Sequence, residues 1–129
     1  MRIDEITSAY HSIIWFACDS AGHILLANSE EGAIPEFVAS DRERTQQLAM
    51  QLCGIEAIDR NRALPIDYTA LAARGFFCYR NDPFEGRLYH LYAKPQTPIT
   101  VDALEDDLRQ LLLAQRLPID LTVCDSFFI

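Results

Sequence analysis

Two apolar runs joined by a four-residue turn constrain the fold of this 129-residue chain more than any other feature. The runs cover residues 12–18 (Ser-Ile-Ile-Trp-Phe-Ala-Cys) and 23–28 (His-Ile-Leu-Leu-Ala-Asn), and the turn is Asp-Ser-Ala-Gly at residues 19–22. An aspartate at the first position and a glycine at the last fit a type I turn. Because both faces of each run are apolar, we expect a β-hairpin at the centre of a sheet that is covered on both sides.

Apolar periodicity and capping residues predict the other elements. Ser40 and Glu43 fit a capping box, so a helix is expected from Ser40 until Gly54 ends it. Residues 55–65 are expected to be irregular. Further helices are predicted over residues 3–10, 67–74 and 100–116, and further strands over 76–81, 87–94 and 119–124. The prediction is one α+β domain over residues 1–129, with a mostly antiparallel sheet of about five strands and two main helices.

The net charge of −8, from 19 acids against 11 bases, limits the classes of partner. Binding to nucleic acid needs clustered bases, and the chain has a single lysine, Lys94, so we expect no nucleic-acid partner. An acidic surface either attracts a basic protein or only keeps the chain soluble, and both interpretations stay open here.

Sequence patterns also predict the cellular compartment of the chain. No run reaches 18 consecutive apolar residues, so we expect no membrane span. The first five residues (Met-Arg-Ile-Asp-Glu) carry acids where a signal peptide needs an apolar run. The cysteines form no Cys-x-x-Cys pair, which favours free thiols in a reducing cytoplasm; they are Cys18, Cys53, Cys78 and Cys124.

One pair of residues suggests an enzyme. If Asn81 pairs with Arg87 across the turn, Cys78 falls opposite His90. A cysteine beside a histidine is the arrangement that produces a thiolate nucleophile, so a small thiol-dependent enzyme is one alternative. A buried structural cysteine is the competing interpretation. The same register separates an apolar strand face from a mixed one; the apolar face holds Phe77, Tyr79, Tyr89 and Leu91, and the mixed face Phe76, Cys78, Arg80, Leu88, His90 and Tyr92.

Four acids lie within six positions near the start of the last predicted helix: Asp102, Glu105, Asp106 and Asp107. They either bind a divalent cation or interact with the positive end of the helix dipole. No histidine joins them and their spacing matches no calcium-binding loop, so we expect the dipole interaction, no metal and no other cofactor.

A second acidic group follows the predicted hairpin. Glu30, Glu31 and Glu36 lie in a loop that contains Gly32, and Asp41 comes shortly after it. Loops held by a rigid hairpin often carry binding residues, so this loop is a candidate for docking the basic side chains of a protein partner. The alternative is a solvated turn before a helix.

The last five residues, Asp-Ser-Phe-Phe-Ile at 125–129, include three apolar side chains. They either pack across the domain or form part of a dimer contact, since leaving that much apolar area in water is unfavourable. A structural or regulatory homodimer is therefore another alternative.

Residues 14–24 (Ile-Trp-Phe-Ala-x-Asp-x-x-Gly-His-Ile) and 34–38 (Ile-Pro-Glu-Phe-Val) resemble the front of small bacterial proteins related to toxin-immunity families. Residues 75–79 (Gly-Phe-Phe-x-Tyr) and 89–95 (Tyr-x-Leu-x-Ala-x-Pro) resemble their later hairpin, so the resemblance covers about half the chain. The loop at 29–32 (Ser-Glu-Glu-Gly) is more acidic and less glycine-rich than the family pattern. The resemblance implies a cytoplasmic protein that neutralises a toxin by direct binding.

The leading prediction is a non-enzymatic binding protein of bacterial immunity type that masks a basic partner through its acidic surface. The expected contacts are Glu30, Glu31, Glu36 and Asp41, followed by Glu105, Asp106 and Asp107. The alternatives are a thiol enzyme that uses Cys78 and His90, and a homodimer closed by sheet faces or by the tail.

Overall fold

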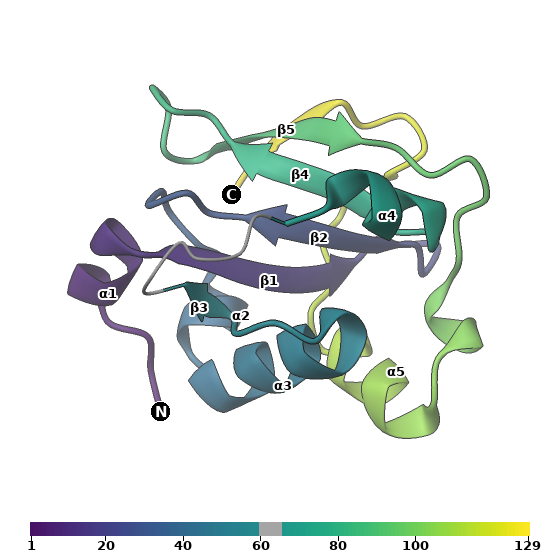
Figure 1. Ribbon diagram of the computed structural model, residues 1–129, viewed down its shortest axis with the longest axis horizontal. Coiled ribbons are helices and arrows are strands. Elements are labelled where there is room, and N and C mark those ends of the chain that lie inside the picture. Colours follow the sequence, from purple (N-terminus) through teal and green to yellow (C-terminus); the bar gives the residue numbers. More distant parts are fainter. Residues whose placement is uncertain (60–65) are drawn as a thin grey trace.

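The computed structural model describes residues 1–59 and 66–129, and its centre is a six-stranded sheet in the order β3-β1-β2-β4-β5-β6 (Figure 1). Its strands are β1 (Ser12–Cys18), β2 (Ile24–Asn28), β3 (Ile58–Asp59), β4 (Phe77–Asn81), β5 (Leu88–Ala93) and β6 (Ser126–Phe128). Neighbouring strands are antiparallel except β2 and β4, which are parallel. The α+β class is confirmed, with a mixed sheet that contains one parallel pair.

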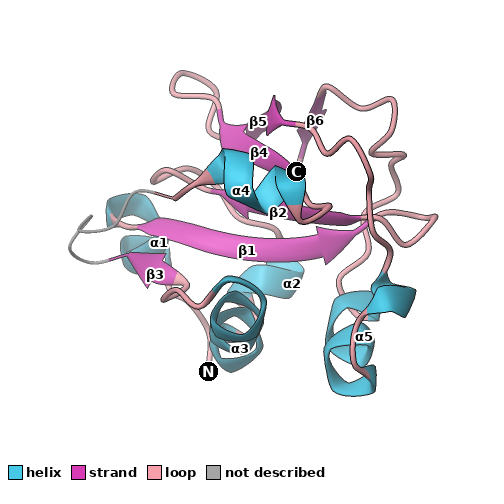
Figure 2. Cartoon of the chain, turned by 45° about the vertical axis from the view of Figure 1, so that its right-hand side comes forward, coloured by secondary structure: helices cyan, strands magenta, loops and turns pink. Residues whose placement is uncertain are grey.

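Helices cover both faces of this sheet. They are α1 (Glu5–Tyr10), α2 (Glu36–Ala39), α3 (Arg42–Cys53), α4 (Tyr68–Ala73), the 3-10 helix η1 (Val101–Ala103) and α5 (Asp106–Leu113). Leucines of α3, α4 and α5 pack with Ile14 and Phe16 on one face. Val38 of α2 and Leu121 pack with Trp15 on the other face. Figure 2 shows α3 and α5 on the same side of β1.

The central hairpin is confirmed. All of β2 is buried, and so is all of β1 except Ser12. At the turn, the Gly22 N–H donates to the Asp19 carbonyl at 3.1 Å, and Gly22 has φ = +87°, a conformation that glycine adopts without strain. A hairpin that is apolar on both faces therefore lies inside the domain, as its sequence indicates.

A buried carboxylate holds the turn of this hairpin. Oδ1 of Asp19 accepts the N–H groups of Ala21 at 3.0 Å and His23 at 2.8 Å. Oδ2 accepts the Leu121 N–H at 3.0 Å and lies 3.1 Å from Nδ1 of His23. Asp19 is fully buried, so these contacts replace the water that its charge would otherwise need. They also fix the segment 117–124 against the hairpin.

The predicted capping box at Ser40 is wrong. Asp41 is the N-cap of α3, and its carboxylate accepts the Arg44 N–H at 2.9 Å. Ser40 instead ends α2, because its N–H donates to the Glu36 carbonyl at 2.9 Å. The Glu43 side chain takes no part in capping the helix, and its Oε2 instead accepts a hydrogen bond from the amino group of Met1 at 2.7 Å.

The predicted helix over 100–116 is interrupted. Leu104 and Glu105 are extended between η1 and α5, and Glu105 is the N-cap of α5. The cause lies before the break: Thr100 forms a β-bridge with His23, and the Val101 N–H donates to the Gly22 carbonyl at 2.9 Å. Because residues 100 and 101 are bonded to the central hairpin, the backbone there does not continue along the axis of α5.

The predicted strand over 119–124 is also wrong, and a strand forms at Ser126–Phe128 instead. Side chains form hydrogen bonds with backbone groups that a neighbouring strand would otherwise bond. Asp19 accepts the Leu121 N–H, and the Tyr79 hydroxyl donates to the Cys124 carbonyl. The apolar alternation here reflects packing rather than a strand, since Leu121 is buried while Val123 is 79% exposed.

Two expectations at other places also need correction. In the predicted leading helix, Ile3 is buried but precedes α1, whereas Ile6 and Tyr10 are exposed. Within the segment 55–65, expected to be irregular, Ile58–Asp59 forms the short strand β3, and residues 60–65 lie outside the described residues.

Replacement of Asp19 by alanine is expected to lower the free energy of unfolding by about 3 kcal/mol, because buried backbone N–H groups would lose their acceptor. The measurement is urea unfolding followed by circular dichroism. The matched control is Asp125→Ala on the exposed surface, expected to change stability by less than about 0.5 kcal/mol. Equal effects of the two substitutions would contradict a structural role for Asp19.

Candidate functional site

The two loops that follow the parallel strands β2 and β4 meet at one end of the sheet. The arrowheads of both strands point the same way in Figure 1, so residues 29–34 and 82–87 leave the sheet together. The Ala33 N–H donates to the Gly86 carbonyl at 2.8 Å, which joins the loops. We call residues 29–34 and 82–87 the loop edge. In open α/β sheets, ligands bind beyond the carboxyl ends of parallel strands, so this end is the first place to look for a site.

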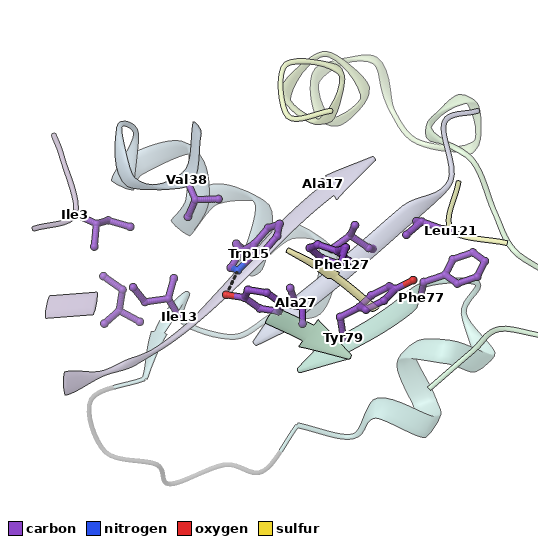
Figure 3. Close-up of a cluster of buried hydrophobic side chains, with 13 residues drawn as sticks. Ile3, Ile13, Trp15, Ala17, Ala27, Val38, Phe77, Tyr79, Leu121 and Phe127 are labelled. Atoms are coloured by element: carbon purple, nitrogen blue, oxygen red, sulfur yellow. Dashed lines mark hydrogen bonds between the residues drawn. The ribbon is translucent and has the colours of Figure 1, made fainter. Parts of the chain in front are cut away.

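Buried hydrogen bonds fix the loop edge to the core. Nε1 of Trp15 donates to the Tyr89 hydroxyl at 3.2 Å, drawn as the dashed line in Figure 3. The Tyr89 hydroxyl in turn donates to the Ala33 carbonyl at 2.6 Å. Burial raises the pKa of Tyr89 above its usual range, so the hydroxyl remains a donor. The position of the first loop therefore depends on two side chains of the sheet core.

The first loop also approaches the end of β4 closely at Gly32. A Cβ atom at Gly32 would lie 2.4 Å from Oδ1 of Asn81, so any larger residue would displace the Asn81 side chain. Nδ2 of Asn81 donates to the Gly86 carbonyl at 2.7 Å. Glycine at position 32 therefore leaves the space in which the Asn81 side chain holds the second loop.

The first loop displays two glutamates on strained backbone. Glu30 has φ = +45° and Glu31 has φ = +69°, in the left-handed region that costs a non-glycine residue about 1–2 kcal/mol. The Glu30 N–H donates to Oδ1 of Asn28 at 3.0 Å, and the Glu30 carboxylate accepts from Nε of Arg80 at 3.0 Å. Such strain persists only where neighbouring contacts enforce it, and it is most common at functional sites.

Aromatic rings and a cation lie beside these glutamates. The Arg80 guanidinium lies 4.8 Å from the ring centroid of Tyr92 and 5.8 Å from that of Tyr68. The two rings meet edge to face at 4.9 Å, and the Tyr68 hydroxyl accepts from Nδ2 of Asn28 at 3.0 Å. Tyrosine and arginine are the residue types that contribute most to protein interfaces.

The second loop presents a phenylalanine to solvent. Phe84 is 97% exposed, yet its backbone is held, because Oδ1 of Asp82 accepts the N–H groups of Phe84 at 2.8 Å and Glu85 at 2.9 Å. Oδ2 of Asp82 lies 2.8 Å from Nε2 of His90. The His90 contact and the two backbone N–H groups lower the pKa of Asp82, so the carboxylate that organises the loop stays ionised. A large apolar side chain is thus displayed on an ordered turn.

The predicted pairing of Cys78 with His90 is wrong. His90 lies opposite Arg80, and Cys78 lies opposite Ala93 next to a register shift. The loop closes between Asp82 and Leu88, whose N–H···O bond of 2.7 Å sets a register two residues away from the expected one. A shift of two residues keeps the faces of the strand, so the apolar and mixed faces are confirmed although the pair is lost.

The chemistry of Cys78 also differs from that of a nucleophile. Its side chain is fully buried, and burial raises the pKa of the thiol to about 12. A thiol of that pKa is protonated at neutral pH, whereas reactive cysteines are exposed and have lowered pKa values. The Cys–His pair that suggested a thiol enzyme is therefore not formed, and His90 pairs with Asp82 instead.

The four acids predicted to dock a partner, Glu30, Glu31, Glu36 and Asp41, are divided among the loop edge and the helices α2 and α3. Glu30 and Glu31 belong to the loop edge, whereas Glu36 lies at the start of α2 and forms two hydrogen bonds with Arg2 at 2.5 and 2.9 Å. Asp41 is the N-cap of α3 and is occupied by that role. Only the first two acids are brought to the candidate site.

The acids near the start of the last predicted helix lie elsewhere in the fold, and Asp102 is separated from the others because it belongs to η1. Glu105 is the N-cap of α5, Asp106 and Asp107 form its first turn, and all three are exposed. Asp106 pairs with Arg109 on the same helix. The group therefore interacts favourably with the helix dipole, as expected. In Figure 1, α5 lies at the opposite end of the domain from the loop edge.

One group among the described residues has the spacing of metal ligands, and it differs from the group considered in the sequence. Ligand atoms of Asp19, His23 and Asp120 lie within 4.8 Å of one another. The Asp19 oxygens already accept three backbone N–H groups and contact the His23 ring, so their lone pairs are engaged. These contacts show that Asp19 and His23 lie close together because they hold the turn of the hairpin.

Searches of protein-family models, curated proteins and solved structures found no match to this chain. The resemblance to toxin-immunity families therefore stays a prediction from its residues. In the described part of the chain, no helix combines the length and the apolar character needed to cross a membrane.

Substitution of Tyr89 by phenylalanine is expected to lower the free energy of unfolding by about 2 kcal/mol, because the Trp15 N–H and the Ala33 carbonyl would lose their buried partner. Amide exchange of residues 29–34 should accelerate as the loop loses its attachment. Thermal unfolding and exchange measured by mass spectrometry test both effects. Tyr92→Phe on the same strand is the control, since Tyr92 is 59% exposed; if it behaves like Tyr89→Phe, the anchoring role is refuted.

Proposed function

We propose that the chain is a non-enzymatic bacterial binding protein of the immunity type, which acts in the cytoplasm and neutralises a basic protein such as a toxin domain. The observation that carries this proposal is the loop edge. There, Glu30 and Glu31 occupy strained backbone in a loop that is fixed to the buried core and bonded to the turn that carries the 97% exposed Phe84. A loop that only connected two elements would not need this construction.

Charge supports a basic partner. The chain carries a net charge of −8, and such a surface accelerates encounter with a basic protein at low ionic strength. Glu30 and Glu31 would direct the partner to the loop edge. The acids of α5 contribute to the long-range field but lack a neighbouring exposed aromatic side chain among those described.

The aromatic side chains support an interface of specific geometry. A partner that covers Phe84 and Tyr92 would bury apolar area, which supplies most of the binding free energy at hot spots. Arg80 stacks on Tyr92 and pairs with Glu30, so its orientation is set before binding and little side-chain entropy is lost.

The test is affinity capture with the purified chain from lysate of the organism that encodes it. We expect retention of a basic protein at ~50 mM salt and strong loss at ~500 mM salt, because screening shortens the range of the attraction. Recovery of no basic protein at low salt contradicts the proposal. If the captured protein arrests growth when expressed, co-expression of the chain should restore growth.

Two matched charge reversals locate the contact surface. Glu31→Lys with Glu85→Lys changes the loop edge, and Glu105→Lys with Asp107→Lys makes the same change of net charge on α5. The first pair should weaken binding of the captured protein at least about tenfold more than the second. Phe84→Ala should weaken it without any change of charge. Equal losses from both pairs, with no effect of Phe84→Ala, would mean that only net charge matters.

A further inference from the structure

His90 is bonded to the carboxylate that holds the turn displaying Phe84. Nε2 of His90 lies 2.8 Å from Oδ2 of Asp82. Oδ1 of the same carboxylate accepts the N–H groups of Phe84 at 2.8 Å and Glu85 at 2.9 Å. The Asp82 conformation that pairs with His90 is therefore the conformation that holds the turn.

The His90 imidazole can change its charge near neutral pH. Its side chain is 49% exposed, so protons reach it from solvent, and histidine is the side chain that ordinarily titrates between pH 5 and 8. Asp82 stays ionised over this range, because its contact with His90 and the two backbone N–H groups lower its pKa. A neutral imidazole forms a hydrogen bond with this carboxylate, whereas a protonated one forms an ion pair, which adds Coulomb attraction.

Arg80 is the charged residue that faces His90 from β4. It lies opposite His90 in the register of β4 and β5, and like charges in such a pair repel each other. Glu30 offsets part of this repulsion, because its carboxylate accepts from Nε of Arg80 at 3.0 Å. Attraction to Asp82, in direct contact at 2.8 Å, therefore outweighs the effect of Arg80.

The strand β6 and the helix α4 place uncharged side chains on this face. Ser126 of β6 lies opposite His90, and Asp125 lies on the other face because successive side chains alternate. Tyr92 lies two residues after His90 on β5, and Tyr68 of α4 packs on it with ring centroids 4.9 Å apart. Tyrosines are neutral near pH 7, so the charges that act on His90 here are those of Asp82 and Arg80.

Resting on the proposed function of the loop edge, we infer that protonation of His90 regulates this surface by ordering the turn that displays Phe84. A stronger pair with His90 raises the population of the Asp82 conformation that also accepts the two N–H groups. The added order is present while His90 carries its proton, and it is lost as the pH rises through the range in which histidine titrates. A partner that binds Phe84 would then meet an ordered turn more often at mildly acidic pH.

The first test measures the purified chain alone, so its result does not depend on whether a basic partner is ever captured. Exchange of the Phe84 and Glu85 amides with water is followed by NMR between about pH 5.5 and 8 and divided by the intrinsic rate at each pH. Protection should fall about two- to fivefold as the pH rises, which is the range that an exposed ion pair supplies. The midpoint should equal that of the His90 ring signals. Constant protection across this range overturns the inference.

Two matched variants assign the effect to one histidine. His90→Gln keeps a side-chain N–H donor for Asp82 but cannot be protonated, so protection of the two amides should no longer change with pH. His11→Gln is the control, since Nδ1 of His11 contacts the Thr7 carbonyl of α1, and it should keep the pH dependence of the unmodified chain. A pH dependence that survives in His90→Gln would refute the inference.

Discussion

The burial of β1 on both faces is the constraint on which the other elements depend. One edge of this strand pairs with β2, but the other pairs with β3 only at Ser12 and Ile13. The remaining backbone groups need partners, because buried unpaired groups are costly. Gln115 supplies two of these partners: its side chain donates to the Phe16 carbonyl at 2.6 Å, and its own carbonyl accepts the Cys18 N–H at 3.0 Å. The Leu117 N–H supplies a third by donating to the Cys18 carbonyl at 2.9 Å. The backbone groups of β1 that find no partner in β3 therefore position the residues that follow α5.

The same strand determines the geometry of the loop edge. Trp15 faces the opposite side from Phe16 and reaches the Tyr89 hydroxyl, which holds Ala33. Because β2 and β4 are parallel, the loop that contains Ala33 leaves the sheet next to the turn after β4. Hydrogen bonds from buried core residues therefore hold the exposed part of the candidate site in place. If a partner docks there as proposed, a surface with this support would lose little conformational entropy.

Sequence patterns predicted those features that depend on local periodicity. The central hairpin follows from two apolar runs joined by a turn. The two faces of β4 follow from alternation, which survives an error of two residues in the register with β5. The caps and breaks that were wrong depend on contacts distant in sequence: Thr100 pairs with His23, and Leu121 donates to Asp19. The cluster of Arg80 with its two tyrosines was missed for the same reason, since Tyr68 belongs to α4. Only Arg80 and Tyr92 were visible, as members of the mixed strand face.

The proposed function divides recognition at the loop edge between charge and apolar contact. Attraction between the glutamates and a basic partner would fall steeply with salt, whereas burial of the exposed Phe84 ring would depend on salt much less. The part of the proposed binding that survives at high salt would therefore depend on Phe84.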